Sequence, residues 1–276
     1  MELIHIIALA IMQGITEFLP VSSSAHLLLP AELLGWPDQG LVFDVAVHVG
    51  SLAAVIIYFR KDIVDLVLAW FTSLVPRQTM SQIDQNNSRL AWLIILGTVP
   101  AGLAGLLFHD VVEQHFRSIA VVAFTTVFFG ILLGLADRIG RRENSENNIR
   151  LSELTVLMVL VIGFSQALAL VPGTSRSGVT ITAALFLGIG RVDAARLSFL
   201  LSIPIILLSG AYKALGLVGQ VNVAWMELFL GATFSALSAY LCIHYFLKTI
   251  NRMGMMPFVV YRLLLGAVLA WLAFFA

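Results

Sequence analysis

Charged side chains are scarce in this chain of 276 residues, where aspartate, glutamate, lysine and arginine together make up 12 %. Soluble domains carry roughly 25 % charged residues. Apolar residues make up 59 % of the chain, and the mean hydropathy is +0.96. These values exclude an ordinary soluble domain and predict an integral membrane protein.

Three further absences narrow the classes of function. The formal net charge is +0 and the chain has no basic cluster beyond the arginines of 138–142, which argues against a nucleic-acid partner. The single cysteine, Cys242, lies in an apolar run and excludes an intrachain disulfide framework. We expect no cleaved signal peptide, because Glu2 replaces the usual positive start and Glu17 would lie inside the apolar segment.

Apolar segments recur from end to end, and the polar interruptions between them are too short for a soluble domain. We therefore predict a single membrane domain over residues 1–276. The segments with the length of a transmembrane helix are Leu41–Phe59, Leu90–Phe108, Ile119–Ala136, Leu197–Leu217, Trp225–Leu247 and Pro257–Ala276. Ile63–Val75 is shorter and is expected to be interfacial or peripheral.

Two apolar segments, Val21–Leu34 and Val179–Ile189, fall well below the roughly 20 residues that a spanning helix needs. We expect each to pair with the helix before it, Leu3–Leu19 or Leu154–Val171, as a re-entrant hairpin. The chain then consists of a hairpin plus three spans in repeat one, about 1–150, and the same in repeat two, about 151–276. An odd number of spans inverts the second repeat. The predicted fold is an all-α polytopic membrane protein with six transmembrane helices and two re-entrant helical hairpins in an inverted-topology repeat.

Positive residues are distributed as this topology requires, since lysine and arginine collect on the cytoplasmic side. One side would hold Arg60, Lys61, Arg77, Arg89, Arg138, Arg141, Arg142, Arg150, Arg191, Arg196, Lys248 and Arg252. The other side would hold only Arg117 and Lys213. Both termini are then expected outside the cytoplasm, while Arg176 and Arg262 remain within membrane segments.

Polar residues concentrate where the two hairpins turn, at residues 17–26 (EFLPVSSSAH) and 172–180 (PGTSRSGVT). Serines at a helix start usually cap the helix. An arginine at the bilayer centre costs roughly 2.5–3.5 kcal/mol on insertion scales, so we expect Arg176 to be paired and functional. Two helix N-termini that converge on an arginine fork favour a phosphate site, and Gly173 and Gly178 let the backbone approach closely. The predicted substrate-binding residues are Ser22, Ser24, Gly173, Thr174, Ser175, Ser177 and Thr180.

Glu17 would repel a phosphate unless a cation lies between them or the carboxylate acts as a base. Gln13 and Glu17 share a helix face, so we expect them to hold a divalent cation, Mg²⁺ or Ca²⁺, together with substrate phosphates. A direct Glu17–Arg176 ion pair is the alternative, and the two arrangements can coexist during a catalytic cycle. The predicted nucleophile is Ser23, with His26 one helical turn away as general acid or base; His26 itself or a water molecule are the alternatives.

Two weaker patterns carry less information. Asp44 and His48 form an i, i+4 pair for which helix capping and a water-facing lining are at least as good an interpretation as a role near the site. Residues 14–17 (GITE) align with 163–166 (GFSQ), which is a modest sign of the internal repeat.

Residues 13–26 resemble the glutamate-rich motif of the bacterial undecaprenyl-diphosphate phosphatases, the bacitracin-resistance family, and 172–180 resemble that family's Pro-Gly-x-Ser-Arg-Ser-x-x-Thr motif. The similarity covers the whole chain in length, segment order and motif position. It implies six spans with two re-entrant hairpins, and an active site formed by Glu17, Ser23, His26, Ser175, Arg176, Ser177 and Thr180. Gln13 stands where the family has Glu or Gln, so a two-carboxylate mechanism is in doubt.

The resemblance also implies an activity and a location. Members of the family hydrolyse undecaprenyl diphosphate to the monophosphate with a divalent cation, which recycles the lipid carrier of peptidoglycan synthesis and confers bacitracin resistance. The implied location is the bacterial inner (plasma) membrane, with the site open to the outer, periplasmic face. The expected partners are a polyprenyl diphosphate substrate and membrane lipid, and a homodimer is left open.

A transporter or flippase of polyprenyl phosphate lipids is the competing hypothesis, because inverted repeats with broken helices are typical of such proteins. The combination of serine, histidine and glutamate exceeds what binding alone requires, and it therefore favours the enzyme.

Overall fold

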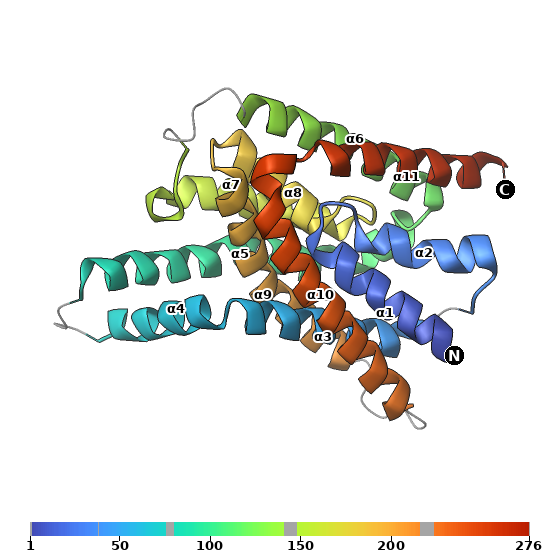
Figure 1. Ribbon diagram of the computed structural model, residues 1–276, viewed down its shortest axis with the longest axis horizontal. Coiled ribbons are helices and arrows are strands. Elements are labelled where there is room, and N and C mark those ends of the chain that lie inside the picture. Colours follow the sequence, from blue (N-terminus) through green and yellow to red (C-terminus); the bar gives the residue numbers. More distant parts are fainter. Residues whose placement is uncertain (1, 38, 76–79, 141–147, 216–223, 276) are drawn as a thin grey trace.

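Helices make up nearly all of the computed structural model, which describes residues 2–37, 39–75, 80–140, 148–215 and 224–275 (Figure 1). The α-helices are α1 (Leu3–Phe18), α2 (Ser23–Leu34), α3 (Gly40–Tyr58), α4 (Arg60–Ser73), α5 (Gln82–His115), α6 (Ile119–Gly140), α7 (Val156–Ala167), α8 (Arg176–Phe186), α9 (Arg191–Leu215), α10 (Trp225–Met253) and α11 (Met256–Phe275). Two short 3₁₀ turns, η2 (Leu151–Glu153) and η3 (Leu168–Leu170), flank α7. Arg77, Arg141, Arg142, Leu217 and Ala276, which entered the predictions above, lie outside the described residues.

Six helices are long and apolar enough to cross a membrane. They are Gly40–Tyr58, Gln82–Val112, Ile119–Gly140, Arg191–Ala214, Trp225–Met253 and Met256–Phe275. Each coincides with one of the predicted spans, so the all-α fold and the number of spans are confirmed. The regions near both chain ends lie at the same end of the molecule (Figure 1), as the predicted topology requires.

The two predicted hairpins are present as helix pairs, α1 with α2 and α7 with α8. Each second helix follows a serine with a left-handed backbone, Ser22 at φ 75° and Ser175 at φ 69°. Among the described non-glycine residues, only these two have positive φ. Such a conformation costs about 1–3 kcal/mol and persists where the surroundings enforce it. The same strain at matching points supports the predicted inverted repeat, while insertion of the hairpins into the membrane stays a prediction.

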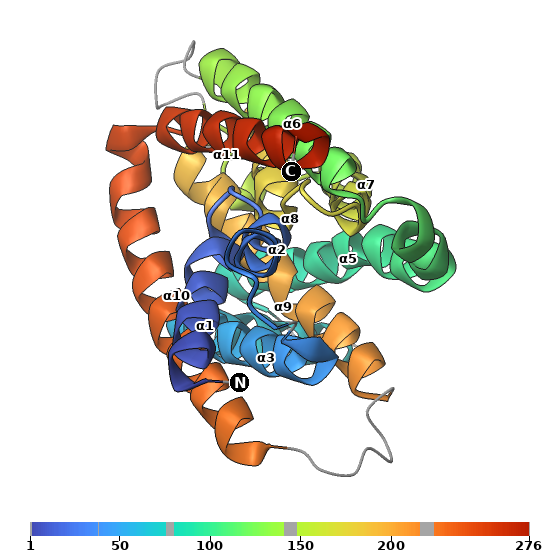
Figure 2. The ribbon, with the colours of Figure 1, turned by 90° about the vertical axis from the view of Figure 1, so that its right-hand side faces the viewer.

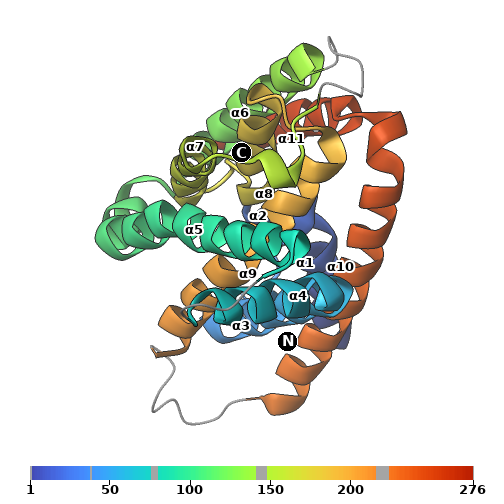
Figure 3. The ribbon, with the colours of Figure 1, turned by 90° about the vertical axis from the view of Figure 1, so that its left-hand side faces the viewer.

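The short segment expected to be interfacial or peripheral is α4, which follows α3 almost without interruption. It runs alongside the first half of α5 (Figure 3), with Leu66 and Ala69 buried. The rings of Trp70 and Trp92 lie 5.6 Å apart and join the two helices. α4 thus packs against a predicted span, and its position relative to the membrane surface stays a prediction.

The side chain of Arg262 joins the two hairpin turns to the rest of the bundle. It projects from α11, which lies beside α6 (Figures 1 and 2), and its exposed fraction is 0 %. All of its nitrogens donate to main-chain oxygens over 2.9 to 3.3 Å. The acceptors are the carbonyl groups of Pro20, Thr125, Thr126, Gly173 and Thr174. One guanidinium therefore connects α11, α6 and both hairpin turns.

We expect Arg262→Met to destabilise the fold by several kcal/mol, because each buried group left without a partner costs about 1–3 kcal/mol. For a chain of this size, the unfolding temperature in detergent should fall by about 10 °C. Tryptophan fluorescence during heating provides the measurement, and Arg252→Met, which removes an exposed arginine, is the control. Equal unfolding temperatures for the two variants would contradict the assigned role of Arg262.

Candidate active site

The two hairpin turns meet in one polar pocket with a volume of about 240 Å³. Its polar lining comes from the first hairpin (Thr16, Glu17, Ser22, Ser23 and Ser24), the second hairpin (Gln166, Ser175 and Arg176), α3 (His48) and α9 (Ser209). Ala101 of α5 and Ile205 of α9 close its apolar side. Residues far apart in the chain thus converge where the sequence predicts the site.

Glu17 makes the electrostatic contact between the hairpins. Its side chain is 8 % exposed, and Oε1 lies 3.0 Å from Nη2 of Arg176. Oε2 accepts hydrogen bonds from Ser23 and Gln13, each over 3.0 Å. A buried carboxylate is tolerated only with such compensation. The structure therefore contains the direct Glu17–Arg176 pair that the sequence left as an alternative.

Arg176 is paired, as predicted, and stands at the first position of α8. Its Nη1 donates to the Ser198 carbonyl over 3.1 Å, and its guanidinium lies 5.9 Å from the centre of the Phe18 ring. The Ser175 hydroxyl caps the helix by accepting from the Gly178 N–H over 3.1 Å. The partial positive charge of the helix start and the guanidinium therefore face one pocket, which suits an anion.

The predicted substrate-binding residues separate into two groups. Ser22, Ser24 and Ser175 line the pocket, whereas Gly173, Thr174, Ser177 and Thr180 lie behind its wall. Ser177 donates to the Leu19 carbonyl over 2.8 Å, and Ser24 accepts from the Gly173 N–H over 3.3 Å. Thr180 bonds the Ser198 hydroxyl over 2.7 Å. Ser177 and Gly173 therefore hold the two turns together, whereas Thr180 joins α8 to α9 and Thr174 accepts from Arg262 through its carbonyl. Direct contact of these residues with substrate stays a prediction.

Ser23 and His26, the predicted nucleophile and general acid or base, bond to different partners. The Ser23 hydroxyl donates to Glu17, and Nδ1 of His26 lies 2.6 Å from the Ser22 carbonyl. Because a carbonyl only accepts, Nδ1 donates, and Nε2 of a neutral ring accepts from the Tyr261 hydroxyl 2.6 Å away. This geometry favours Glu17 as the group that takes a proton from Ser23. An acid–base role of His26 stays a prediction.

Three polar residues of this region were missed or undervalued in the sequence. His48 lines the pocket, with Nε2 3.9 Å from Oε2 of Glu17 and Nδ1 bonded to the Asp44 carbonyl over 2.7 Å. Tyr261 holds His26 from α11, and Gln166 lines the pocket from α7. The alignment of residues 163–166 with 14–17 could have identified Gln166. His48 and Tyr261 depend on how α3 and α11 pack, for which the sequence holds no comparable signal.

The oxygen atoms around Glu17 fit a cation that prefers oxygen ligands. Among the described residues, Oε1 of Gln13 is buried and accepts no hydrogen bond, while its amide nitrogen donates to Glu17. The same part of the chain contains no group of three or more His, Cys, Asp or Glu side chains that could hold a metal ion. Mg²⁺ is often bound by one or two protein carboxylates, with substrate phosphates and water completing its shell. The Glu17 carboxylate meets that pattern, and the Gln13 amide would meet it after turning its oxygen toward Glu17, because its nitrogen faces the carboxylate in this structure.

A larger hollow of about 710 Å³ continues from the polar pocket between α5 and α9. The two spaces share Ser24, Ala101, Ala169, Leu170, Ile205 and Ser209 as lining. Most of the remaining lining is apolar, but His109, Arg117, Tyr212 and Lys213 stand at the far ends of α5 and α9. We refer to this space as the α5–α9 hollow.

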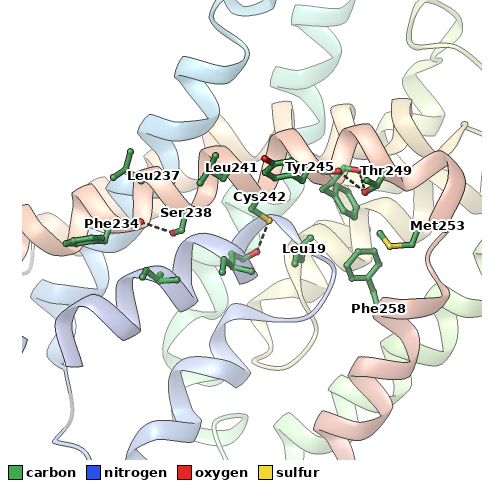
Figure 4. Close-up of a pocket in the computed structure, with 13 residues that line it drawn as sticks. Leu19, Phe234, Leu237, Ser238, Leu241, Cys242, Tyr245, Thr249, Met253 and Phe258 are labelled. Carbon is green, nitrogen blue, oxygen red and sulfur yellow. Dashed lines mark hydrogen bonds between the residues drawn. The ribbon is translucent and has the colours of Figure 1, made fainter. Parts of the chain in front are cut away.

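A separate groove of about 630 Å³ lies between α1 and α10 (Figure 4). Apart from Tyr245, its polar side chains bond to main-chain oxygens: Ser238 to Phe234 over 2.8 Å, Thr249 to Tyr245 over 2.7 Å and Cys242 to Ile15 over 3.2 Å. The groove therefore presents an apolar surface. It shares no lining residue with the polar pocket.

Comparison with known proteins agrees with the motifs in the pocket. The profile of the family described as bacitracin resistance protein BacA matches residues 6–268. The undecaprenyl-diphosphatase of Saccharophagus degradans is 59 % identical over 276 residues, which cover 100 % of both chains. That of Teredinibacter turnerae is 57 % identical over 270 residues, 98 % of both chains. Undecaprenyl-diphosphatase 2 of Stutzerimonas stutzeri is 56 % identical over 270 residues, 98 % of this chain and 97 % of the relative.

The matched region includes both hairpin turns and all six candidate spans, apart from the last residues of α11. The relatives align over essentially their full length, so the similarity is not confined to one segment. On this basis, the chain belongs to the bacitracin resistance protein (BacA) family.

Proposed function

We propose that this protein is a membrane phosphatase that hydrolyses undecaprenyl diphosphate to undecaprenyl phosphate and inorganic phosphate. The observation that carries the proposal is the Glu17–Arg176 pair at the junction of the two hairpin turns, beside the Ser23 hydroxyl. A cation that can bind phosphate, a carboxylate that can take a proton and a hydroxyl lie within one pocket. Relatives named undecaprenyl-diphosphatase align with the entire chain.

The geometry supports a reaction in which charge is redistributed between the two hairpins. Phosphate oxygens replace Glu17 as acceptors of the Arg176 hydrogen bonds and also contact the N-terminus of α8. Both contacts stabilise the negative charge of the transferring phosphoryl group. Glu17, released from the arginine, accepts the proton of Ser23 as Oγ bonds to the terminal phosphorus and the bond to the lipid phosphate breaks. Water then hydrolyses the phosphoserine and releases inorganic phosphate. Direct attack by a water molecule positioned by Ser23 is the alternative course.

A divalent cation, Mg²⁺ or Ca²⁺, belongs to the proposal, with Glu17 and Gln13 as its protein ligands. When bound, it would offset the repulsion between the carboxylate and the phosphates. Gln13 would take this role by rotating its amide, because its nitrogen now donates to Glu17 while its buried oxygen accepts no hydrogen bond from the described residues.

The lipid tail is proposed to lie in the α5–α9 hollow, which is the apolar space that opens into the polar pocket. Arg117 and Lys213, near its far end, are the two cations that the topology places outside the cytoplasm. They would attract the diphosphate toward the hollow. The site then opens to the periplasmic face of the bacterial inner membrane, where hydrolysis recycles the carrier lipid for peptidoglycan synthesis and confers bacitracin resistance.

Transport of a polyprenyl phosphate lipid is the less favoured function. A lipid-binding site needs donors for the phosphate, and the arginine and helix start supply them. The hydrogen bond from Ser23 to the buried Glu17 carboxylate places a base beside a hydroxyl, and binding alone does not need such a base. The measurements below separate the two functions, because only the enzyme releases phosphate.

The first prediction concerns Arg176. Purified protein in detergent should release phosphate from undecaprenyl diphosphate in the presence of Mg²⁺ or Ca²⁺. Arg176→Ala should lower kcat/KM by about 10²–10³, as loss of a donor to transition-state charge does. Arg138→Ala, which removes an exposed arginine, should leave the rate unchanged. No phosphate release by the wild-type protein, or full activity of Arg176→Ala, would show that the proposed function is wrong.

The second prediction concerns the cation. Chelation should abolish phosphate release, and Mg²⁺ or Ca²⁺ should restore it. Gln13→Leu should raise the metal concentration for half-maximal activity by about tenfold. This is the smaller of the losses in metal affinity that follow removal of a side chain at a metal site. The unfolding temperature should rise with added metal in the wild-type protein and less in Gln13→Leu. Identical metal titrations for both proteins would exclude Gln13 from the metal site.

The third prediction concerns the tail. A Cβ on Gly102 would lie 3.8 Å from Cδ1 of Leu208, so Gly102→Ala fits at an ordinary contact, whereas Gly102→Leu fills part of the α5–α9 hollow. Loss of room for two methylene groups, about 0.8 kcal/mol each, should lower kcat/KM for undecaprenyl diphosphate about tenfold. Dimethylallyl diphosphate, which has almost no tail, should be hydrolysed as before.

The matched control fills the other groove. Leu241→Trp adds bulk between α1 and α10, where Leu241 is exposed (Figure 4). It should leave both substrates unaffected. If Leu241→Trp and not Gly102→Leu discriminates against the long substrate, the tail lies in the α1–α10 groove.

A further inference from the structure

Gln166 stands in the last turn of α7, where the second hairpin approaches the polar pocket. Its side chain is 2 % exposed and lines the pocket together with Glu17 and Arg176. Within the part of the chain that the structure describes, neither its amide oxygen nor its amide nitrogen has a hydrogen-bond partner. Native proteins keep few buried polar groups in this state, and a ligand that completes the bonds is a physical reason for one to persist.

The position of Gln166 in the repeat indicates what the amide does. Residues 163–166 align with 14–17, so Gln166 is the counterpart of Glu17, just as Ser175 repeats the backbone conformation of Ser22. A carboxylate can only accept hydrogen bonds, whereas an amide has two N–H donors. The first hairpin therefore contributes an acceptor to the pocket and the second contributes a donor at the equivalent place.

The other strong donors in the pocket already have partners. Arg176 donates to Glu17 and to the Ser198 carbonyl, and Ser23 donates to Glu17. An anion must compete with Glu17 for the Ser23 hydroxyl and for the N–H of Arg176 that the carboxylate accepts, but it can bond the amide of Gln166 without breaking a contact. A neutral amide also avoids the ion pair that a second arginine or lysine would form with Glu17.

We infer that Gln166 is a phosphate-binding residue, whose Nε2 donates a hydrogen bond to an oxygen of the substrate diphosphate. The inference rests on the proposed function and adds a donor that neither motif contains. Gln166 and Arg176 then contact the phosphate from the second hairpin, and Glu17 with Ser23 faces it from the first. The phosphate becomes oriented between a donor side and an acceptor side.

The test measures binding in the absence of turnover. The probe is farnesyl methylenediphosphonate, whose bridging carbon prevents hydrolysis, and titration calorimetry in detergent gives its Kd. Loss of a hydrogen bond to a charged group should raise Kd about 10- to 100-fold in Gln166→Leu. Gln166→Glu, which has the same shape but brings a like charge, should raise it further. KM for undecaprenyl diphosphate should change in parallel.

The unfolding temperature separates a ligand-binding role from a structural one. Leucine in place of an amide without partners loses no hydrogen bond, so Gln166→Leu should unfold at the wild-type temperature or above it. Thr182→Val is the matched control, because Thr182 is buried in the same hairpin, outside the pocket, and bonds the Gly178 carbonyl over 2.7 Å. It should lower the unfolding temperature and leave Kd within about twofold.

Each result bears on the inference. Unchanged Kd in Gln166→Leu, with wild-type protein that binds the probe and releases phosphate, would overturn the role of Gln166 and leave the proposed function intact. Wild-type protein that neither binds nor hydrolyses would overturn both. If Gln166→Leu does not fold, Gln166→Asn, which keeps the amide but withdraws it by one methylene, replaces it: weaker binding supports the inference and unchanged binding contradicts it.

Discussion

The pocket of this protein depends on the hydrogen bonds of one buried guanidinium. Arg262 bonds the carbonyl groups of both hairpin turns and of α6, so the ends of four helices are held around a single group. The turns leave helical geometry at Ser22 and Ser175, where main-chain oxygens lose their helix partners inside an apolar bundle. An arginine has five donors in a rigid plane and can satisfy several such oxygens at once. Both hairpins can therefore interrupt their helices inside the bundle while the carbonyl oxygens at the interruptions keep hydrogen-bond partners.

This arrangement frees the second arginine for chemistry. Arg176 contacts one carboxylate and one carbonyl, and it faces a pocket that contains hydroxyl and amide groups. Its pairing with Glu17 keeps both charges compensated in a medium where an isolated charge is costly. In the proposed reaction, an incoming phosphate would replace the carboxylate at the guanidinium and make Glu17 available as a base or a cation ligand. Binding and activation would then be one exchange of partners.

The apolar surfaces around the pocket define how a lipid can reach it. The α5–α9 hollow shares lining residues with the pocket and has cationic side chains near its far end. The α1–α10 groove is nearly as large (Figure 4), but it shares no lining residue with the polar pocket, and Ser238, Cys242 and Thr249 bond to the main chain. Ile11 and Ile15 face that groove, while Gln13 and Glu17 lie on the other face of the same helix. The helical period of α1 thus separates the side that lines the apolar groove from the side that carries Gln13 and Glu17.

The class of fold, the six candidate spans and the stretches that form the pocket could all be predicted from the amino-acid sequence. Hydropathy and helix length are local properties, and a bilayer accepts little other than apolar helices, so these features need no knowledge of packing. The motifs around Glu17, Ser23 and Arg176 identified groups that do meet in one pocket. Their partners depend on how distant helices pack: the pairing of Glu17 with Arg176 spans 159 positions and that of His26 with Tyr261 spans 235. The places of His48, Gln166 and Arg262 were decided in the same way. Whether a polar side chain in an apolar helix faces lipid, a neighbour or a pocket depends on the rotation and packing of helices that no local pattern encodes.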